Sequence, residues 1–88
     1  MTARIQMNDE SANYEVVEDG VSYAAVHTSG NICVCQHETE ERFECAVFFG
    51  DAGGSTLGDL RLVSDADTHE IDGITYESSS TAGWKEVA

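Results

Sequence analysis

Residues 31–45, NICVCQHETEERFEC, contain all three cysteines of the chain together with one histidine and four glutamates. Side chains two residues apart on a β-strand point to the same side, so Cys33, Cys35 and His37 would share one face of a strand. Thiolates and imidazoles are the groups that bind Zn²⁺ in structural sites. The spacing therefore makes Cys33, Cys35, His37 and Cys45 the candidate ligands of a small zinc-binding module.

The zinc hypothesis requires the next segment to be a strand that returns beside the first. A hairpin tip of three residues, 39–41, would bring opposite side chains to about 4.5–5.5 Å between their Cβ atoms. The predicted partners are Cys35 with Cys45, Cys33 with Val47, and His37 with Phe43. The same geometry permits a Cys35–Cys45 disulfide, which a reducing compartment disfavours.

The spacing of the cysteines favours a place in the core over metal binding. Structural zinc sites usually take two ligands from a C-x₂₋₄-C turn, whereas C-x-C on a strand directs both sulfurs along parallel lines. Free cysteine is among the most frequently buried residue types and packs as a small apolar side chain. We therefore expect the three cysteines to lie in the core, with no metal and no other cofactor.

The chain shows no pattern typical of an enzyme. A nucleophilic thiolate needs a nearby cation or helix N-terminus to lower its pKa, and the charges nearest the cysteines are glutamates, which raise it. His27, His37 and His69 have no recognisable catalytic partner in the sequence. We therefore expect a protein that acts by binding rather than by catalysis.

Net charge is the strongest functional signal in the sequence. Seventeen Asp and Glu residues oppose four Lys and Arg residues, which gives a formal net charge of −13. Such a charge repels nucleic acid and anionic membranes and attracts basic proteins, so the expected partner is a basic protein surface. The sequence leaves the oligomeric state open. The acids that we expect to contact the partner are Glu38, Glu40, Glu41, Glu44, Asp65, Asp67, Glu70 and Asp72.

Two hypotheses explain this acidity. In the first, the protein occupies the nucleic-acid-binding surface of a basic partner by presenting carboxylates in place of phosphates, the logic of small acidic inhibitors of restriction and CRISPR machinery. Alternate acids on a strand, such as Glu38 and Glu40, lie about 6.6 Å apart and would meet successive basic side chains. In the second, the acids adapt a generic domain to a halophilic cytoplasm, since they spread from Asp9 to Glu86. The lack of any catalytic or cofactor motif favours the first hypothesis.

Short β-prone runs separated by glycine and Asx residues predict a mainly β fold. Asp19-Gly20 and Asp72-Gly73 are strong signals for two-residue hairpin turns. The predicted strands are Ala3–Met7, Tyr14–Glu18, Val21–Thr28, Ile32–His37, Leu60–Ser64, His69–Ile71, Ile74–Ser78 and Trp84–Val87. We expect a single domain, residues 1–88, in which a small antiparallel meander curls into a barrel or sandwich. Trp84, the only tryptophan, is expected to close the core from the last strand.

Residues 39–49 leave an alternative open. As a helix, this segment would have Thr39 as its N-cap and Gly50 as its stop, giving an α+β fold with a single helix. As a strand, it alternates apolar side chains from Phe43 to Phe49, and its aromatic and β-branched content favours this interpretation. Residues 50–59, GDAGGSTLGD, are predicted to form a connection.

The sequence also indicates where in the cell the protein is located. No apolar run is long enough to span a membrane, and the first residues lack the apolar segment of a secretory signal. An odd number of cysteines does not indicate a disulfide framework. We therefore expect a cytoplasmic protein.

Overall fold

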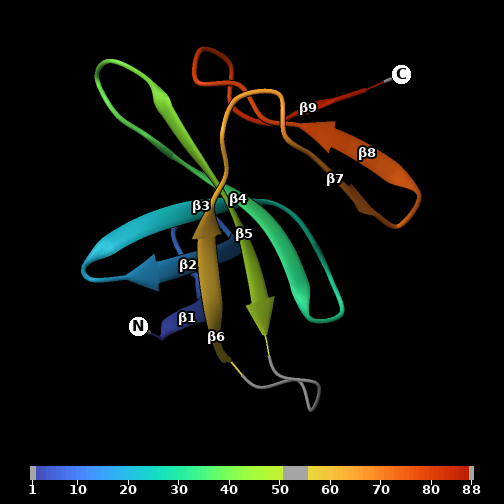
Figure 1. Ribbon diagram of the computed structural model, residues 1–88. Helices are drawn as coiled ribbons and strands as arrows, with labels where there is room; N and C mark the ends of the chain where they lie inside the picture. Colours follow the sequence, from blue (N-terminus) through green and yellow to red (C-terminus); the bar gives the residue numbers. More distant parts are fainter. Residues whose placement is uncertain (1, 51–55, 88) are drawn as a thin grey trace.

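The computed structural model describes residues 2–50 and 56–87, and every regular element in these residues is a β-strand (Figure 1). The strands are β1 (Ala3–Asn8), β2 (Asn13–Glu18), β3 (Val21–Ser29), β4 (Ile32–Glu38), β5 (Phe43–Gly50), β6 (Leu57–Leu62), β7 (Thr68–Ile71), β8 (Ile74–Glu77) and β9 (Lys85–Glu86). The predicted mainly β class is confirmed. The alternative with a helix near residues 39–49 is wrong, because the alternating apolar residues of this segment form β5.

Strands β1 to β6 form a closed antiparallel barrel in which each strand pairs with its neighbour in sequence. Within the described residues, β6 pairs with β1 at two positions, Ala3 with Gly58 and Arg4 with Leu57, and this pairing closes the barrel. A Cβ atom at position 58 would lie 2.8 Å from the Cα atom of Gly50 and would collide with the carbonyl oxygen of Phe49. The absence of a side chain at Gly58 therefore lets β6 lie close against β5, at the position where β6 also pairs with Ala3 of β1.

The barrel interior is filled by alternate residues of the six strands. The buried residues of this cluster are Ala3, Val16, Tyr23, Ala25, Cys33, Cys35, Ala46 and Phe48. Cys33 and Cys35 have no accessible surface, and Cys45 is only 4% exposed in a second cluster. All three cysteines are free thiols, and all three are buried. The prediction that they lie in the core is therefore confirmed.

The β4–β5 hairpin has a turn of four residues, 39–42, where three were predicted. Glu38 pairs with Phe43, and consequently Gln36 rather than Cys35 lies opposite Cys45. A shift of one residue turns every side chain of a strand to the other face, so Cys45 points away from the barrel interior. The predicted partners Cys35–Cys45, Cys33–Val47 and His37–Phe43 are therefore wrong.

Strands β7, β8 and β9 form a second antiparallel sheet beside the barrel (Figure 1). Its apolar residues pack on the outer face of β4 and β5 and form a second core. The buried members are Val34, Cys45, Val47, Ile71, Tyr76 and Trp84. The Trp84 indole N–H donates to the carbonyl oxygen of Cys35 at 2.8 Å, which fixes the ring against the barrel wall. The predicted burial of Trp84 is confirmed.

A chain of hydrogen bonds ties the β7–β8 hairpin to β3. The His27 ring lies between the Tyr76 hydroxyl, 2.9 Å from Nδ1, and the Asp72 carboxylate, 3.1 Å from Nε2. The second oxygen of Asp72 accepts a hydrogen bond from the Ser29 hydroxyl at 2.7 Å. Asp72 and Gly73 both have positive φ angles, 53° and 79°, as a type I′ turn requires. The hairpin tip is therefore held on the barrel wall.

The observed strand bounds follow the prediction closely except at β6. This strand begins at Leu57, inside the stretch 50–59 that was predicted as a connection, and ends at Leu62 instead of Ser64. Residues 51–55 of that stretch lie outside the described residues. The last predicted strand is reduced to Lys85–Glu86. In the described ranges there is no helix long and apolar enough to cross a membrane.

Candidate functional site

The barrel topology gathers acidic residues at one end. In an up-and-down barrel, alternate connections emerge at the same end, and here these are the β2–β3 turn, the β4–β5 turn and the β6–β7 link. The two turns project toward the same side in Figure 1. We call this region the acidic end; its carboxylates are Glu18, Asp19, Glu38, Glu40, Glu41, Glu44, Asp65 and Asp67.

The Tyr23 phenol is influenced by acidic residues next to two of these connections, the β2–β3 turn and the β4–β5 turn. Burial raises the pKa of Tyr23, and the negative charges of Glu44 on β5 and Glu18 on β2 raise it further. Both carboxylates therefore lie in the neighbourhood of Tyr23, although 26 positions of sequence separate them. The His37 ring packs beside Tyr23 with 5.7 Å between the ring centroids.

The β4–β5 turn is shaped by the Thr39 side chain. Its hydroxyl donates to the carbonyl oxygen of Arg42 at 2.8 Å and accepts the Arg42 N–H at 3.0 Å, while the Thr39 N–H donates to the same carbonyl at 2.8 Å. These bonds satisfy the backbone of a four-residue turn without glycine. The turn holds Glu40 and Glu41 at a fixed, exposed tip.

Glu38, Glu40 and Glu41 form the free part of the acidic end. All three side chains are exposed, and their carboxylates make no hydrogen bond or ion pair with any described residue. Glu44 differs, because its carboxylate is half-buried and lies 3.7 Å from the Arg42 guanidinium. The hairpin tip is thus the part of the acidic end best able to meet an external cation.

The other predicted contact acids are mostly engaged inside the protein. Asp65 accepts hydrogen bonds from the Ser80 N–H and hydroxyl, both at 2.8 Å, and Asp67 accepts the Ser64 N–H at 3.0 Å. Asp72 holds the β7–β8 hairpin on β3, as described above. These three carboxylates shape connections between elements. Glu70 is exposed on β7 and lies outside the acidic end.

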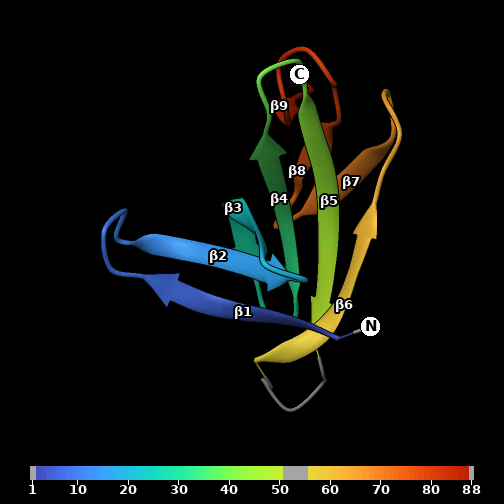
Figure 2. The ribbon, with the colours of Figure 1, turned by 90° about the vertical axis from the view of Figure 1, so that its left-hand side faces the viewer.

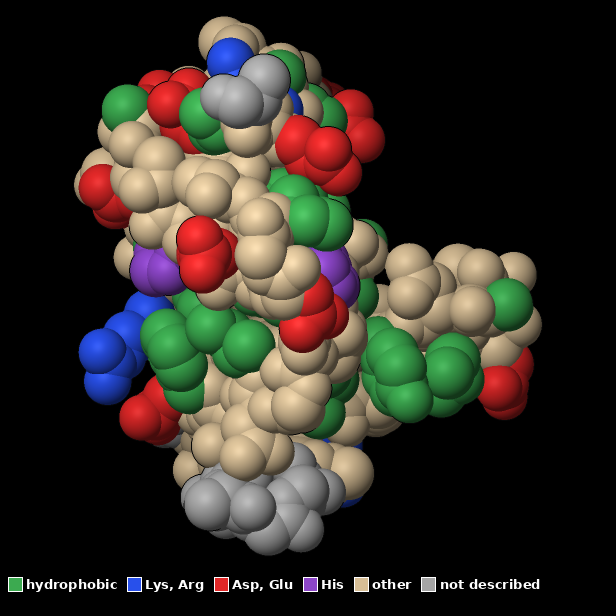
Figure 3. Space-filling view, turned by 90° about the vertical axis from the view of Figure 1, so that its right-hand side faces the viewer, with side chains coloured by type: hydrophobic (Ala, Val, Ile, Leu, Met, Phe, Trp, Pro, Cys, Tyr) green, Lys and Arg blue, Asp and Glu red, His purple; other side chains and the backbone are tan. Residues whose placement is uncertain are grey.

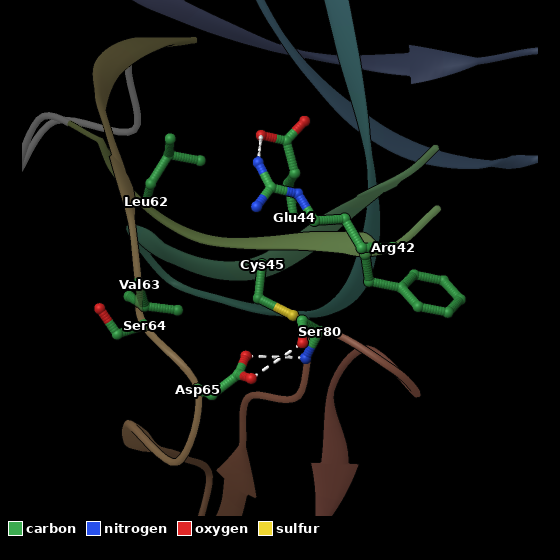
Figure 4. A pocket seen from close by; sticks show the side chains of 9 residues that line it. Arg42, Glu44, Cys45, Leu62, Val63, Ser64, Asp65 and Ser80 are labelled. Atoms are coloured by element: carbon green, nitrogen blue, oxygen red, sulfur yellow. Dashed lines mark hydrogen bonds and ion pairs between the residues drawn. The ribbon is translucent and has the colours of Figure 1, made fainter. Parts of the chain in front are cut away.

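A cleft of about 510 Å³ opens at the acidic end, between the base of the β4–β5 hairpin and the segment that follows β6 (Figure 4). Its wall includes Arg42, Glu44, Asp65 and the apolar side chain of Leu62, and Cys45 lies at its floor. Burial and the negative charge of Asp65 raise the pKa of the Cys45 thiol. This thiol is therefore held in its protonated form, which is a poor nucleophile.

The four candidate zinc ligands do not converge. Cys33 and Cys35 point into the barrel, Cys45 lies in the second core, and His37 lies at the barrel mouth with Nδ1 3.1 Å from the Ser22 carbonyl oxygen. The hydrogen bond with Cys33 and burial both raise the pKa of the Cys35 thiol. Within residues 2–50 and 56–87, no three His, Cys, Asp or Glu side chains are arranged to hold a metal ion.

No protein-family model matches this chain, and no curated protein or solved structure is significantly similar to it.

Two features of the site were missed from the sequence. Glu18 and Asp19 belong to the acidic end because the β2–β3 and β4–β5 turns lie on the same side of the barrel. Successive connections in a meander alternate between the two ends of a barrel, and this rule indicates that the β2–β3 and β4–β5 turns share an end. The hydrogen bonds of Asp72 join residues more than forty positions apart, and no local pattern in the sequence marks them.

Proposed function

We propose that the acidic end binds a basic, nucleic-acid-binding surface of a partner protein and occupies the place of the nucleic acid. The observation that carries this proposal is the β4–β5 tip, where three exposed glutamates without internal partners stand on a turn fixed by Thr39. Glu18 and Asp19 of the neighbouring β2–β3 turn add negative charge at the same end. In this function the protein acts as a non-enzymatic inhibitor or nucleic-acid mimic.

Two physical effects support the proposal. A net charge of −13 creates a long-range field that accelerates encounter with a basic surface, in the way that the phosphate backbone attracts such surfaces. A turn that is already ordered loses less conformational entropy on binding than a flexible loop. Charge and preorganisation thus act at the same place in the molecule.

The proposal is tested by competition for DNA. A panel of restriction endonucleases and RNA-guided nucleases is mixed with labelled duplex DNA, and displacement by the protein is measured at several salt concentrations. We expect at least one nuclease to lose DNA, with an affinity for the protein that falls steeply as salt rises. The triple variant Glu38→Lys, Glu40→Lys, Glu41→Lys should lose at least about 90% of this competition, because it reverses the charge of the tip.

The matched control is Asp59→Lys, Glu70→Lys, Glu86→Lys. These three acids are exposed and lie outside the acidic end, and the control changes the net charge by the same amount. It should retain most of the competition. Equal losses in the two triple variants would show that net charge alone matters and would refute a site at the tip.

Salt adaptation is the second candidate, and the spread of the remaining acids favours it. Figure 3 shows the face opposite the β2–β3 and β4–β5 turns, where acidic side chains are distributed over the surface and are not confined to one patch. A halophilic domain should unfold below about 1 M salt, the concentration at which the Debye length reaches about 3 Å. A cooperative thermal transition at ordinary salt would argue against this candidate.

A further inference from the structure

The β1–β2 hairpin extends beyond the barrel as a two-stranded arm, residues 6–14 (Figure 2). Pairing with β6 covers Ala3 and Arg4, and next to it the Ile5 N–H donates to the Thr56 carbonyl oxygen at 2.8 Å. Beyond that point the pairings of β1 with the described residues are to β2, such as Met7 opposite Tyr14. The arm projects sideways from the barrel, and Asn8 and Ser11 near its tip line a shallow hollow together with His37 and Glu38 of β4 (Figure 2).

The two faces of the arm differ in kind. On one face the Glu15 carboxylate accepts hydrogen bonds from Ser22 at 2.6 Å, Gln6 at 2.8 Å and Asn8 at 3.2 Å. The hydrogen bonds from Ser22 and Gln6 lower the pKa of Glu15. The other face continues the apolar interior of the barrel with Met7 and Tyr14, which are 49% and 43% exposed. The polar network stiffens the arm and leaves its apolar face open.

A cleft of about 470 Å³ lies between this apolar face and the barrel. Its apolar lining comes from Ile5, Met7, Tyr14, Ile32 and Phe48, and none of the described residues that line it carries a charge. Figure 3 shows hydrophobic side chains gathered on the projecting arm. The volume falls within the range of pockets that hold small organic groups, so a large aliphatic or aromatic side chain can enter it.

The charge around the cleft indicates what kind of molecule would fill it. Asp9 and Glu10 follow β1 at the tip of the arm, and the whole chain carries a net charge of −13. A second copy of the chain would bring equal charge to the cleft, which disfavours self-association. A segment with an apolar side chain flanked by Lys or Arg would fill the apolar cleft, and its basic residues would be attracted by the negative charge around it.

We infer that the cleft beneath the β1–β2 arm is a docking site for a protein segment that carries an aliphatic or aromatic side chain between basic residues. This inference is independent of the proposed function, because the residues that form the cleft share none of the carboxylates of the acidic end. The arm supplies one wall through Met7 and Tyr14, and the barrel supplies the floor through Phe48.

The probe is a labelled peptide, Lys-Lys-Leu-Phe-Lys-Lys, compared with Lys-Lys-Ser-Ser-Lys-Lys of equal charge. Binding to the full chain is followed by fluorescence anisotropy and by NMR of the methyl and ring signals. We expect the apolar peptide to bind at least about tenfold tighter, the difference that burial of one large apolar side chain gives. Its binding should shift the signals of Met7, Tyr14 and Ile5.

The matched variant is Met7→Ser, Tyr14→Ser, which changes two exposed side chains and leaves the core residues in place. It should bind both peptides equally weakly. The tip variant Glu38→Lys, Glu40→Lys, Glu41→Lys should keep the preference for the apolar peptide, so failure of one proposal is distinguishable from failure of the other.

Three results would overturn the inference. Equal affinities of the two peptides for the unaltered protein would show that charge alone drives binding. NMR shifts confined to the acidic end would place the peptide elsewhere. Dimers seen by sedimentation at ordinary salt, and lost in Met7→Ser, Tyr14→Ser, would identify the cleft as a contact between copies of the chain.

Discussion

Asp72 makes hydrogen bonds that stabilise the fold, although its place in a run of acidic residues predicts a residue that contacts a partner. It sits in a run of alternating acids, and its carboxylate nevertheless accepts a hydrogen bond from Ser29 and lies 3.1 Å from the His27 ring. Hydrogen bonding by Ser29, assisted by His27, lowers the pKa of Asp72. A carboxyl group with a lowered pKa in the folded state stabilises the fold in its charged form.

We predict that Asp72→Ala lowers the thermal midpoint of unfolding at neutral pH. The stabilisation by Asp72 is complete above the pKa of an aspartic acid in the unfolded chain and is lost as the pH falls through the lower pKa of the folded state. The difference in midpoint between the two proteins should therefore shrink at about pH 2, below the usual range for aspartic acid. Circular dichroism melts across this range measure the difference.

Glu70→Ala is the control for Asp72→Ala. Glu70 is exposed on the strand that precedes the turn. It should leave the midpoint nearly unchanged at every pH. A midpoint difference for Asp72→Ala that stays constant down to about pH 2 would contradict the role assigned to its charged form.

At the scale of the elements, turn chemistry explains both what the sequence predicts and where prediction fails. Asp19-Gly20 and Asp72-Gly73 each adopt two positive φ angles, as two-residue hairpins require, and the strands on either side were predicted within a residue or two. The β4–β5 turn contains no glycine, and the Thr39 side chain takes the place of such a signal. The register, and with it the face occupied by Cys45, could not be read from the sequence.

The division of the strands into two sheets was also beyond the sequence. Runs such as Val21–Ser29 and Ile74–Glu77 alternate apolar and polar residues in the same way, yet the first belongs to the barrel and the second to the outer sheet. The choice depends on long-range packing of Trp84 and Tyr76 on the outer face of β4 and β5. Local periodicity carries no information about that choice.

We predict that Gly58→Ala destabilises the protein by at least about 2 kcal/mol, the scale of forced overpacking. The added methyl group would collide with the backbone of β5 at Phe49 and Gly50, where neither strand can move without breaking the seam to β1. Denaturant titration measures the change in free energy of unfolding. Asp59→Ala, at the exposed neighbouring position, should cost much less, and equal costs would contradict the steric explanation.

At the scale of the whole molecule, charge opposes compactness. Seventeen acidic residues share a chain of 88 residues with only four Lys and Arg residues, and the described ion pairs are few and mostly exposed. Surface pairs of this kind contribute little to stability. The two cores must therefore hold the fold against net repulsion.

We predict that raising NaCl from about 0.1 M to about 1 M, which shortens the Debye length from about 10 Å to about 3 Å, raises the thermal midpoint. A rise of about 5 °C corresponds to roughly 1 kcal/mol for a domain of this size. The variant Glu38→Gln, Glu40→Gln, Glu41→Gln removes three charges from the acidic end and should show a smaller rise. A midpoint independent of salt would mean that repulsion among the carboxylates is unimportant.

The two-pair seam between β1 and β6 has a consequence for the order in which the chain folds. Every other strand pairing described in the barrel joins strands adjacent in sequence, so these hairpins can form locally and at small entropic cost. The seam joins the first and last strands of the barrel and must wait until all the strands between them are in place. Until then the apolar side chains of the barrel interior stay open to water, and they become covered when Ala3 and Arg4 pair with Gly58 and Leu57.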